Sequence, residues 1–124
     1  MPKRKAKKAS KRRSAKRKSR GVKIAKLPKH AVTLIVMMRA KEGQQLLVEA
    51  ELRALITPTR REEGCLQFDL HKSVDLPGLF LFHEVWETRE HHSAHRNSPH
   101  FLRWNARKDS LLASYEPTFW QQVA

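Results

Sequence analysis

The sequence contains a single cysteine, Cys65, so the chain can form no disulfide within itself. It also lacks the paired thiolates of a structural zinc site, and a small secreted fold held together by disulfides is excluded. No motif surrounds Cys65, which is expected to be a small buried hydrophobe. A lone thiol is typical of a reducing compartment, and we expect a cytoplasmic protein.

Long apolar runs and glycine-rich loops are also missing. The longest apolar stretch, Ala31 to Met38, is far shorter than the about 18–20 residues that a membrane-spanning helix needs. The basic segment before it is too long for a signal peptide, and no small-residue cleavage site follows, so we expect a soluble protein without a membrane segment. The sequence contains no phosphate-binding loop, dinucleotide fingerprint or nucleophile elbow.

Acidic residues are absent from residues 1–29, which carry fifteen of the 26 lysines and arginines. Residues 30–124 carry the other eleven with all 12 acids, a formal charge of 11 − 12 = −1. The basic segment has too few apolar residues to repay the entropy of folding, so we expect a disordered tail and linker over 1–29 and one domain over 30–124. Weak, sequence-independent binding to nucleic acid and a merely solubilising role both remain open for the tail.

Hydropathy patterning predicts three strands and one helix in the first part of the domain. The strands are expected at residues 31–38, 65–72 and 79–86, and the helix at 44–57, halted near Pro58. In the second strand Leu66, Phe68 and Leu70 are expected on one face. In the third strand Phe80, Phe82, Glu84 and Trp86 are expected to share a face.

Cap residues and a final apolar segment complete the pattern. Thr88 predicts the start of a short helix that runs through Arg96. Ser98, followed by a proline, predicts the start of a second helix that runs to about Ser114. Residues 118–123 predict a last strand. The order is that of the α+β ferredoxin-like split β-α-β sandwich, a four-stranded antiparallel sheet with helices on one face. Because the third strand is apolar on both faces, we expect a homodimer that covers the open sheet face.

Histidine is unusually frequent between residues 83 and 100, which hold five of the 7 in the chain. One hypothesis is a metal site using His91 and His95, one helical turn apart, although the glutamate that follows the first histidine of a zincin is missing. The alternative is that His91 and His92 are solvated and His100 is a packing residue. His95 lies where an apolar pocket between helix and sheet could perturb its pKa, so it is the strongest functional candidate.

Glu84 is a carboxylate on an aromatic strand face. If that face is buried, Glu84 should hydrogen-bond a helix N-terminus or a histidine, His95 or His100. If Glu84 instead lies at a wet strand end, Trp86 is ordinary core.

Three segments carry a family resemblance: Gly64-Cys65-Leu66-x-Phe68-Asp69-Leu70, Phe82-His83-Glu84-Val85-Trp86-Glu87-Thr88 and Ala94-His95-Arg96-Asn97-Ser98-Pro99-His100-Phe101. In this order they resemble the antibiotic biosynthesis monooxygenase domain family, with its quinol monooxygenase members. The resemblance covers about residues 31–122. It implies a dimeric ferredoxin-like fold with a pocket between helices and sheet, and oxygenation of phenols or quinols by O₂ without metal or flavin.

The resemblance also implies site roles, because a phenol reduces O₂ readily only as its anion and so needs a base and a dry aromatic pocket. His95 would be the general base, Glu84 would orient a histidine, and His100 would be a second polar contact. Trp86, with Phe82 or Phe80, would stack against the substrate ring. No cofactor and no metal are expected.

Other activities of the same fold remain as alternatives. Haem degradation is disfavoured, because Val36 stands where haem-degrading relatives have an asparagine. A non-oxygenase member, either a small-metabolite isomerase or a binding protein, is the second hypothesis. The third is a small dimer whose two basic tails associate with nucleic acid.

Overall fold

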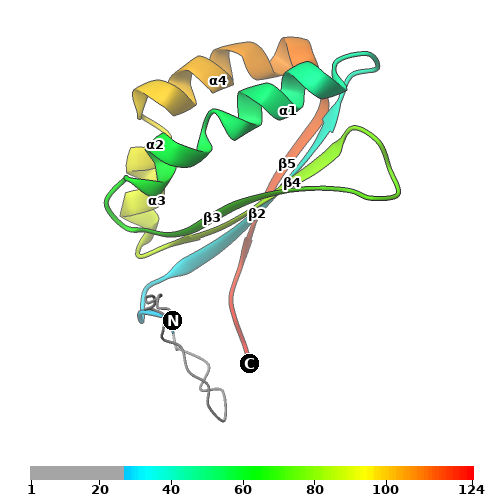
Figure 1. Cartoon of the computed structure of the whole chain (residues 1–124). Helices are drawn as coiled ribbons and strands as arrows, with labels where there is room; N and C mark the ends of the chain where they lie inside the picture. Colours follow the sequence, from blue (N-terminus) through cyan, green and yellow to red (C-terminus); the bar gives the residue numbers. More distant parts are fainter. Residues whose placement is uncertain (1–26) are drawn as a thin grey trace, which may run out of the picture.

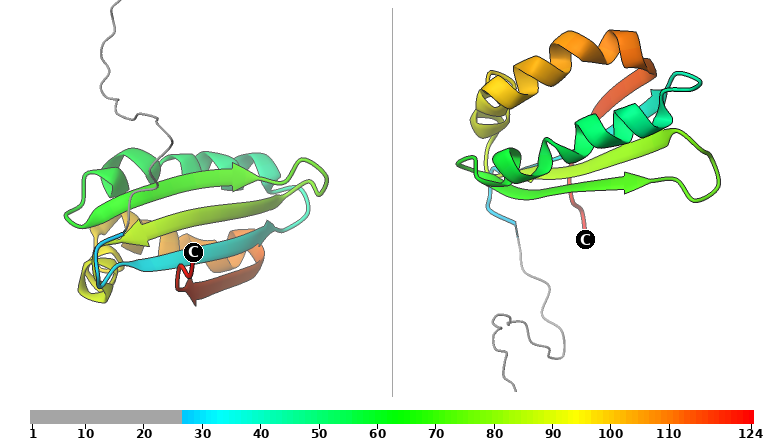
Figure 2. Two further views of the ribbon diagram at one scale, coloured as in Figure 1. Left: turned by 90° about the horizontal axis from the view of Figure 1, so that it is seen from below. Right: turned by 45° about the horizontal axis from the view of Figure 1, so that its top comes forward.

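The computed structural model describes residues 27–124, in which four antiparallel strands form one sheet in the order β3-β4-β2-β5. The strands are β2 (Val32–Ala40), β3 (Cys65–Lys72), β4 (Leu79–Trp86) and β5 (Leu112–Trp120). The helices are α1 (Gln45–Arg53), α2 (Ile56–Arg60), α3 (Arg89–His95) and α4 (Pro99–Leu111). All four helices lie on one face of the sheet (Figures 1 and 2). The predicted ferredoxin-like architecture is confirmed.

The core lies between the helices and the inner face of the sheet. Alternation along β2 and β4 directs Val36 and Phe82, which are register partners at the centre of the sheet, into this layer. Leu52 of α1 and Trp104 of α4 belong to the same buried cluster on the helix side. The predicted inward face of β4 is confirmed, since Phe80, Phe82, Glu84 and Trp86 are all buried.

The last strand begins earlier than the sequence patterning predicts. β5 starts at Leu112, directly after α4, and ends at Trp120, so the expected strand over 118–123 is misplaced. Pro117 lies inside the strand, opposite Val36, and not before it. A proline is accommodated there because β5 is an edge strand, which needs ladder hydrogen bonds on only one side.

The predicted end of a helix near Pro58 is wrong. α1 ends at Arg53, and a new helix, α2, begins at Ile56 with Pro58 as its third residue. The first backbone N–H groups of a helix have no intrahelical acceptor, so a proline in the first turn costs no hydrogen bond. The helical segment therefore continues to Arg60 and carries the chain to the loop that precedes β3.

A bulge at the start of β3 changes the face on which Leu66 lies. Cys65 pairs with Trp86 and Gln67 pairs with Val85, so Leu66 is the extra residue, and its side chain is exposed. The predicted common face of Leu66 and Phe68 is wrong for this reason. Cys65, only partly buried, packs against the core instead.

The face of the sheet opposite the helices is partly apolar. Ile35, Met37, Leu79 and Leu81 lie on it, half-buried. Between residues 27 and 124 no helix is both long and apolar enough to cross a membrane. Most of the predicted basic tail lies outside the described residues.

Candidate functional site

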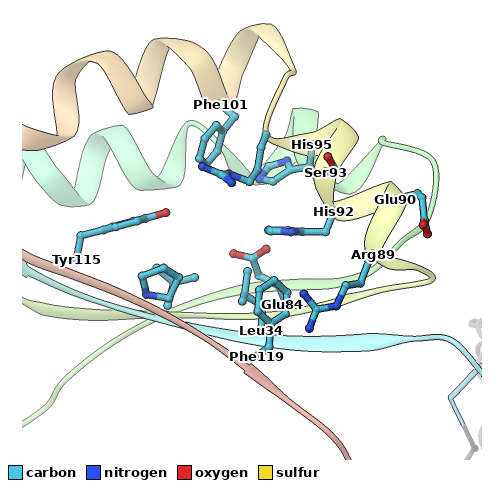
Figure 3. Close-up of a pocket in the computed structure, with 13 residues that line it drawn as sticks. Leu34, Glu84, Arg89, Glu90, His92, Ser93, His95, Phe101, Tyr115 and Phe119 are labelled. Carbon is cyan, nitrogen blue, oxygen red and sulfur yellow. The ribbon is translucent and has the colours of Figure 1, made fainter.

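A cavity of about 540 Å³ opens between α3, the first turn of α4 and the inner face of β2 and β5 (Figure 3). Its apolar wall is formed by Leu34, Val36, Phe101, Tyr115, Pro117 and Phe119. Its polar lining is formed by Glu84, Arg89, Glu90, His92, Ser93, His95 and Arg96. An aromatic wall beside a few convergent polar groups is the usual composition of a small-molecule site.

Two helix caps place His95, which lines this cavity, and His100 beside it. The Thr88 hydroxyl accepts a hydrogen bond from the His91 backbone N–H (3.1 Å) and begins α3, as predicted. The Ser98 hydroxyl accepts one from the Phe101 N–H (3.3 Å) and begins α4, also as predicted. Because the helices begin at these residues, His95 lies in the last turn of α3 and His100 in the first turn of α4.

One carboxylate oxygen joins His95 to His100. Glu62 Oε2 lies 2.7 Å from His95 Nδ1 and 2.6 Å from His100 Nε2. The carboxylate oxygen accepts hydrogen bonds, so both imidazoles donate N–H to it. Ser98 Oγ, which lies 3.2 Å from the same His100 nitrogen, donates its own proton to the His95 carbonyl (2.6 Å). This cluster fixes the His95 tautomer with the proton on Nδ1.

His95 is the most deeply buried titratable residue of the cavity wall, with 2% of its surface exposed. Its ring lies 4.8 Å from the Trp86 ring and 5.1 Å from the Phe101 ring, centroid to centroid. Burial lowers the pKa of His95, and the hydrogen bond with Glu62 opposes that shift. His95 is therefore neutral near pH 7, with Nδ1 bound to Glu62 and Nε2 left to meet a ligand.

Glu84 is buried, and its partner is not a histidine. Glu84 Oε1 accepts a hydrogen bond from the Trp86 indole N–H at 2.9 Å, because residues two apart on a strand share a face. The expected pairing of Glu84 with His95 or His100 is therefore replaced, and Glu62 occupies that role. Burial, with a smaller contribution from the charge of Glu62, raises the pKa of Glu84 to about 7. In Figure 3 its carboxyl group points into the cavity.

The three predicted substrate-stacking residues lie in the core. Trp86 is fully buried, and Phe82 stacks on Phe68 with ring centroids 4.5 Å apart. Phe80 lies away from this cavity, beside a smaller one near α1 and α2. These rings fill the layer between helices and sheet, and the rings that reach the cavity are Phe101, Tyr115 and Phe119.

His91 and His92 are not solvated helix residues, contrary to the alternative in the sequence analysis. His91 Nδ1 bonds with the Thr88 hydroxyl at 2.8 Å, and its ring packs against Gly64. His92 lines the cavity, and burial lowers its pKa to about 4, so it is neutral at pH 7.

Among the described residues, the donor set that could hold a metal ion is Glu62, His95 and His100. Their ligand atoms all lie within 4.8 Å of one another. Two imidazoles and a carboxylate are donors that divalent transition metals accept. The expected pair of His91 and His95 is not brought together in this way, because His91 faces Thr88 and Glu63.

Sequence reasoning missed Glu62, Tyr115, Phe119 and Arg96 as site residues. Glu62 lies in the charged loop before β3, where no periodicity separates it from Glu63. Tyr115 and Phe119 share one face of β5 with Pro117, and a strand assigned from Leu112 onward would have grouped them. Arg96 follows Arg89 by seven residues, the spacing of one helix face.

Comparison with known proteins supports the family resemblance. The family model of antibiotic biosynthesis monooxygenase matches residues 31–107. The chain is 38% identical over 81 residues to Rv0793 of Mycobacterium tuberculosis, which carries a provisional monooxygenase name; the match covers 65% of this chain and 79% of that protein.

Two solved structures have the same fold and are more than 30% identical to this chain in sequence. PA3566 of Pseudomonas aeruginosa superimposes with a TM-score of 0.75 at 35% identity, covering 77% of this chain and 97% of that one. The Rv0793 structure superimposes with a TM-score of 0.72 at 32% identity, covering 76% of this chain and 96% of that one.

Proposed function

Because this chain belongs to the antibiotic biosynthesis monooxygenase family, we propose that it oxidises a quinol or phenol with O₂ in the cavity beside α3, without a cofactor. The observation that carries the proposal is the geometry of His95. Its Nδ1 is held by Glu62 at 2.7 Å, and its ring lines a cavity of about 540 Å³ with an aromatic wall. A neutral imidazole oriented by a carboxylate is the usual arrangement of a general base.

The first step is a proton transfer. The substrate hydroxyl gives its proton to His95 Nε2, and Glu62 stabilises the imidazolium through Nδ1. The resulting phenolate is a much stronger reductant than the phenol and passes electrons to O₂. For a hydroquinone with a free ring position, one oxygen atom replaces the ring hydrogen and the other leaves as water. The substrate ends as a hydroxyquinone and supplies every electron that O₂ takes up, so no external reductant is needed.

The residues around His95 suit this chemistry. Phe101, Tyr115 and Phe119 line the cavity and would stack on a planar ring, the role first expected of Trp86, Phe82 and Phe80. Trp86 supports the ring of His95 from the core instead. His100 would act through Glu62, since it lies outside the cavity lining.

A homodimer and a cytoplasmic location belong to the same proposal. Ile35, Met37, Leu79 and Leu81 leave the open sheet face partly apolar, and a second copy would cover them. Sedimentation equilibrium at micromolar concentration should give twice the chain mass, and a monomer would contradict the dimer.

The test of the oxidation is oxygen uptake by flavin-free protein in the presence of a chelator, with a panel of hydroquinones. Uptake should exceed that of boiled protein, and His95→Ala should lower it by about 10²–10⁴-fold. His30→Ala, which changes an exposed histidine outside the cavity lining, is the matched control and should leave the rate unchanged. Uptake equal to autoxidation across the panel would favour the isomerase or binding-protein alternative. A requirement for added metal would contradict cofactor independence.

A further inference from the structure

We propose that the substrate carries a carboxylate or similar anionic group, which the guanidinium groups of Arg89 and Arg96 bind at the α3 side of the cavity. The inference rests on the proposed function in using the same cavity. It concerns binding, however, and is tested separately from turnover.

The first observation is the face that α3 and the residue after it, Arg96, turn to the cavity. Arg89, His92, Ser93 and Arg96 all line it, at the i, i+3, i+4, i+7 spacing of a single helix face. None of these four side chains is acidic. Glu90 lies at the cavity edge, and in Figure 3 its carboxylate extends away from the guanidinium of Arg89.

The second observation is that neither arginine has a carboxylate partner within residues 27–124. Elsewhere in this part of the chain, Arg53, Arg60 and Arg107 each form an ion pair with an acid. Arg39, Arg61 and Arg103 form none there either, so it is the position of Arg89 and Arg96 in the cavity lining that distinguishes them. Arg89 instead lies over the Phe119 ring, 4.0 Å from its centroid. Stacking holds a guanidinium in place but leaves its in-plane N–H donors free, and their fork geometry matches a carboxylate.

The third observation is the charge of the cavity itself. The positive charges of Arg96 and Arg89 both contribute to lowering the pKa of His92, and Arg96 also acts on Tyr115 across the cavity. The charge of Glu62 acts on His92 in the opposite sense, but Glu62 lies outside the cavity lining, bound to His95 and His100. Two arginines and two glutamates line the cavity, and one of these glutamates, Glu84, is partly protonated because burial raises its pKa to about 7. The lining therefore keeps an excess of positive charge, which favours an anion.

The same charge would assist the proposed oxidation. A positive field near the ring stabilises a phenolate relative to the phenol, so it favours the anion that reacts with O₂. An acidic group on the substrate would also fix which end of the ring lies beside His95.

The experiment is calorimetric titration of the full chain with three stable ligands of one shape: 1-naphthol, 1-hydroxy-2-naphthoate and 1-hydroxy-2-naphthamide. The naphthoate should bind about ten- to a hundredfold more tightly than the naphthol or the neutral amide, as charge-assisted hydrogen bonds predict. Arg89→Gln and Arg96→Gln should each lower this preference, and the double variant should abolish it. Arg103→Gln removes an exposed arginine of α4 outside the cavity lining and should retain the preference. The basic tail is the same in every variant, so it cannot produce these differences.

Equal affinity for the three ligands would overturn the inference, and so would a preference that survives in the double variant. Both arginines are exposed, so their substitution should leave the melting temperature close to that of the parent, and a melt checks this. Oxygen uptake without a carboxylate preference would keep the proposed oxidation and remove the anion site. A carboxylate preference without oxygen uptake would keep the anion site and remove the proposed oxidation.

Discussion

His95 and Glu62 lie 33 residues apart in the sequence, and their Nδ1 and Oε2 atoms are 2.7 Å apart in the fold. The loop before β3 supplies the carboxylate, and the last turn of α3 supplies the imidazole. The same carboxylate oxygen meets His100 from α4, so one glutamate ties three segments together at the cavity.

Replacing Glu62 with glutamine should slow the proposed oxidation by about tenfold or more, because the imidazolium loses its counter-charge and orientation. Glu62 raises the pKa of His95 against the effect of burial. Removing its charge lowers that pKa, so the acid limb of the kcat/KM profile should move to lower pH. Glu63→Gln, which changes the exposed neighbour, is the matched control. A slower Glu62→Gln enzyme whose pH profile is unmoved would indicate a purely structural role.

Gly64 should tolerate alanine much less well than Gly43, although the two have nearly equal φ angles of +81° and +83°. Either substitution costs about 1–2 kcal/mol for placing a Cβ in the left-handed region. At Gly64 the new Cβ would also overlap the His91 ring, whereas nothing lies within 4 Å at Gly43. We expect Gly64→Ala to cost about 1–3 kcal/mol more in urea unfolding. Adding His91→Ala should recover part of this difference, and equal costs at the two glycines would contradict the packing of His91 on Gly64.

Deleting residues 1–28 should abolish retention on DNA without changing quinol oxidation. Residues 1–29 carry fifteen cations and no acid, so their binding to phosphate should weaken steeply with salt. Chromatography on DNA–agarose over a salt gradient measures retention, and oxygen uptake measures turnover. A loss of turnover on deletion would contradict the division of the chain into tail and catalytic domain.

The sequence was sufficient where a short segment determines its own structure. Thr88 and Ser98 cap the helices that they predict, and the alternation of β4 correctly assigned its inner face. It was insufficient where the outcome depends on distant neighbours. The pattern predicts a strand only after Pro117, because nothing in the local sequence shows that β5 is an edge strand, which can contain a proline.

The candidate site shows the same limit. Glu62 and Glu63 are adjacent, yet the Glu62 side chain is 17% exposed and that of Glu63 is 92% exposed. Only the packing of the loop against α3 and α4 decides between them. The burial of His95 could be anticipated from its place near the end of a short helix, beside an apolar pocket between helix and sheet, but its partner could not.

Replacing Glu84 with glutamine should stabilise the protein at pH 8 and have little effect at pH 4. The pKa of Glu84 rises from an ordinary 4.5 to about 7 in the folded protein, chiefly because burial disfavours the charged form. Below pH 4.5 the carboxyl is neutral in both folded and unfolded chains, so folding carries no penalty. As the pH rises from about 4.5 to about 7, Glu84 ionises in the unfolded chain but stays largely neutral in the folded protein. The parent therefore loses stability over this range, by on the order of 3 kcal/mol.

Glutamine is neutral at every pH, and its carbonyl can still accept the hydrogen bond from the Trp86 indole. The measurement is the free energy of unfolding in urea at pH 4, 6 and 8 for both proteins. The contributions of other titratable groups are the same in parent and variant, so they cancel in the difference between the two free energies of unfolding. This difference should grow with pH between about 4.5 and 7. A difference that is flat across this range would show that Glu84 ionises as freely in the folded protein as in the unfolded chain. Its carboxylate would then have to be counted as a full negative charge in the cavity that Arg89 and Arg96 also line.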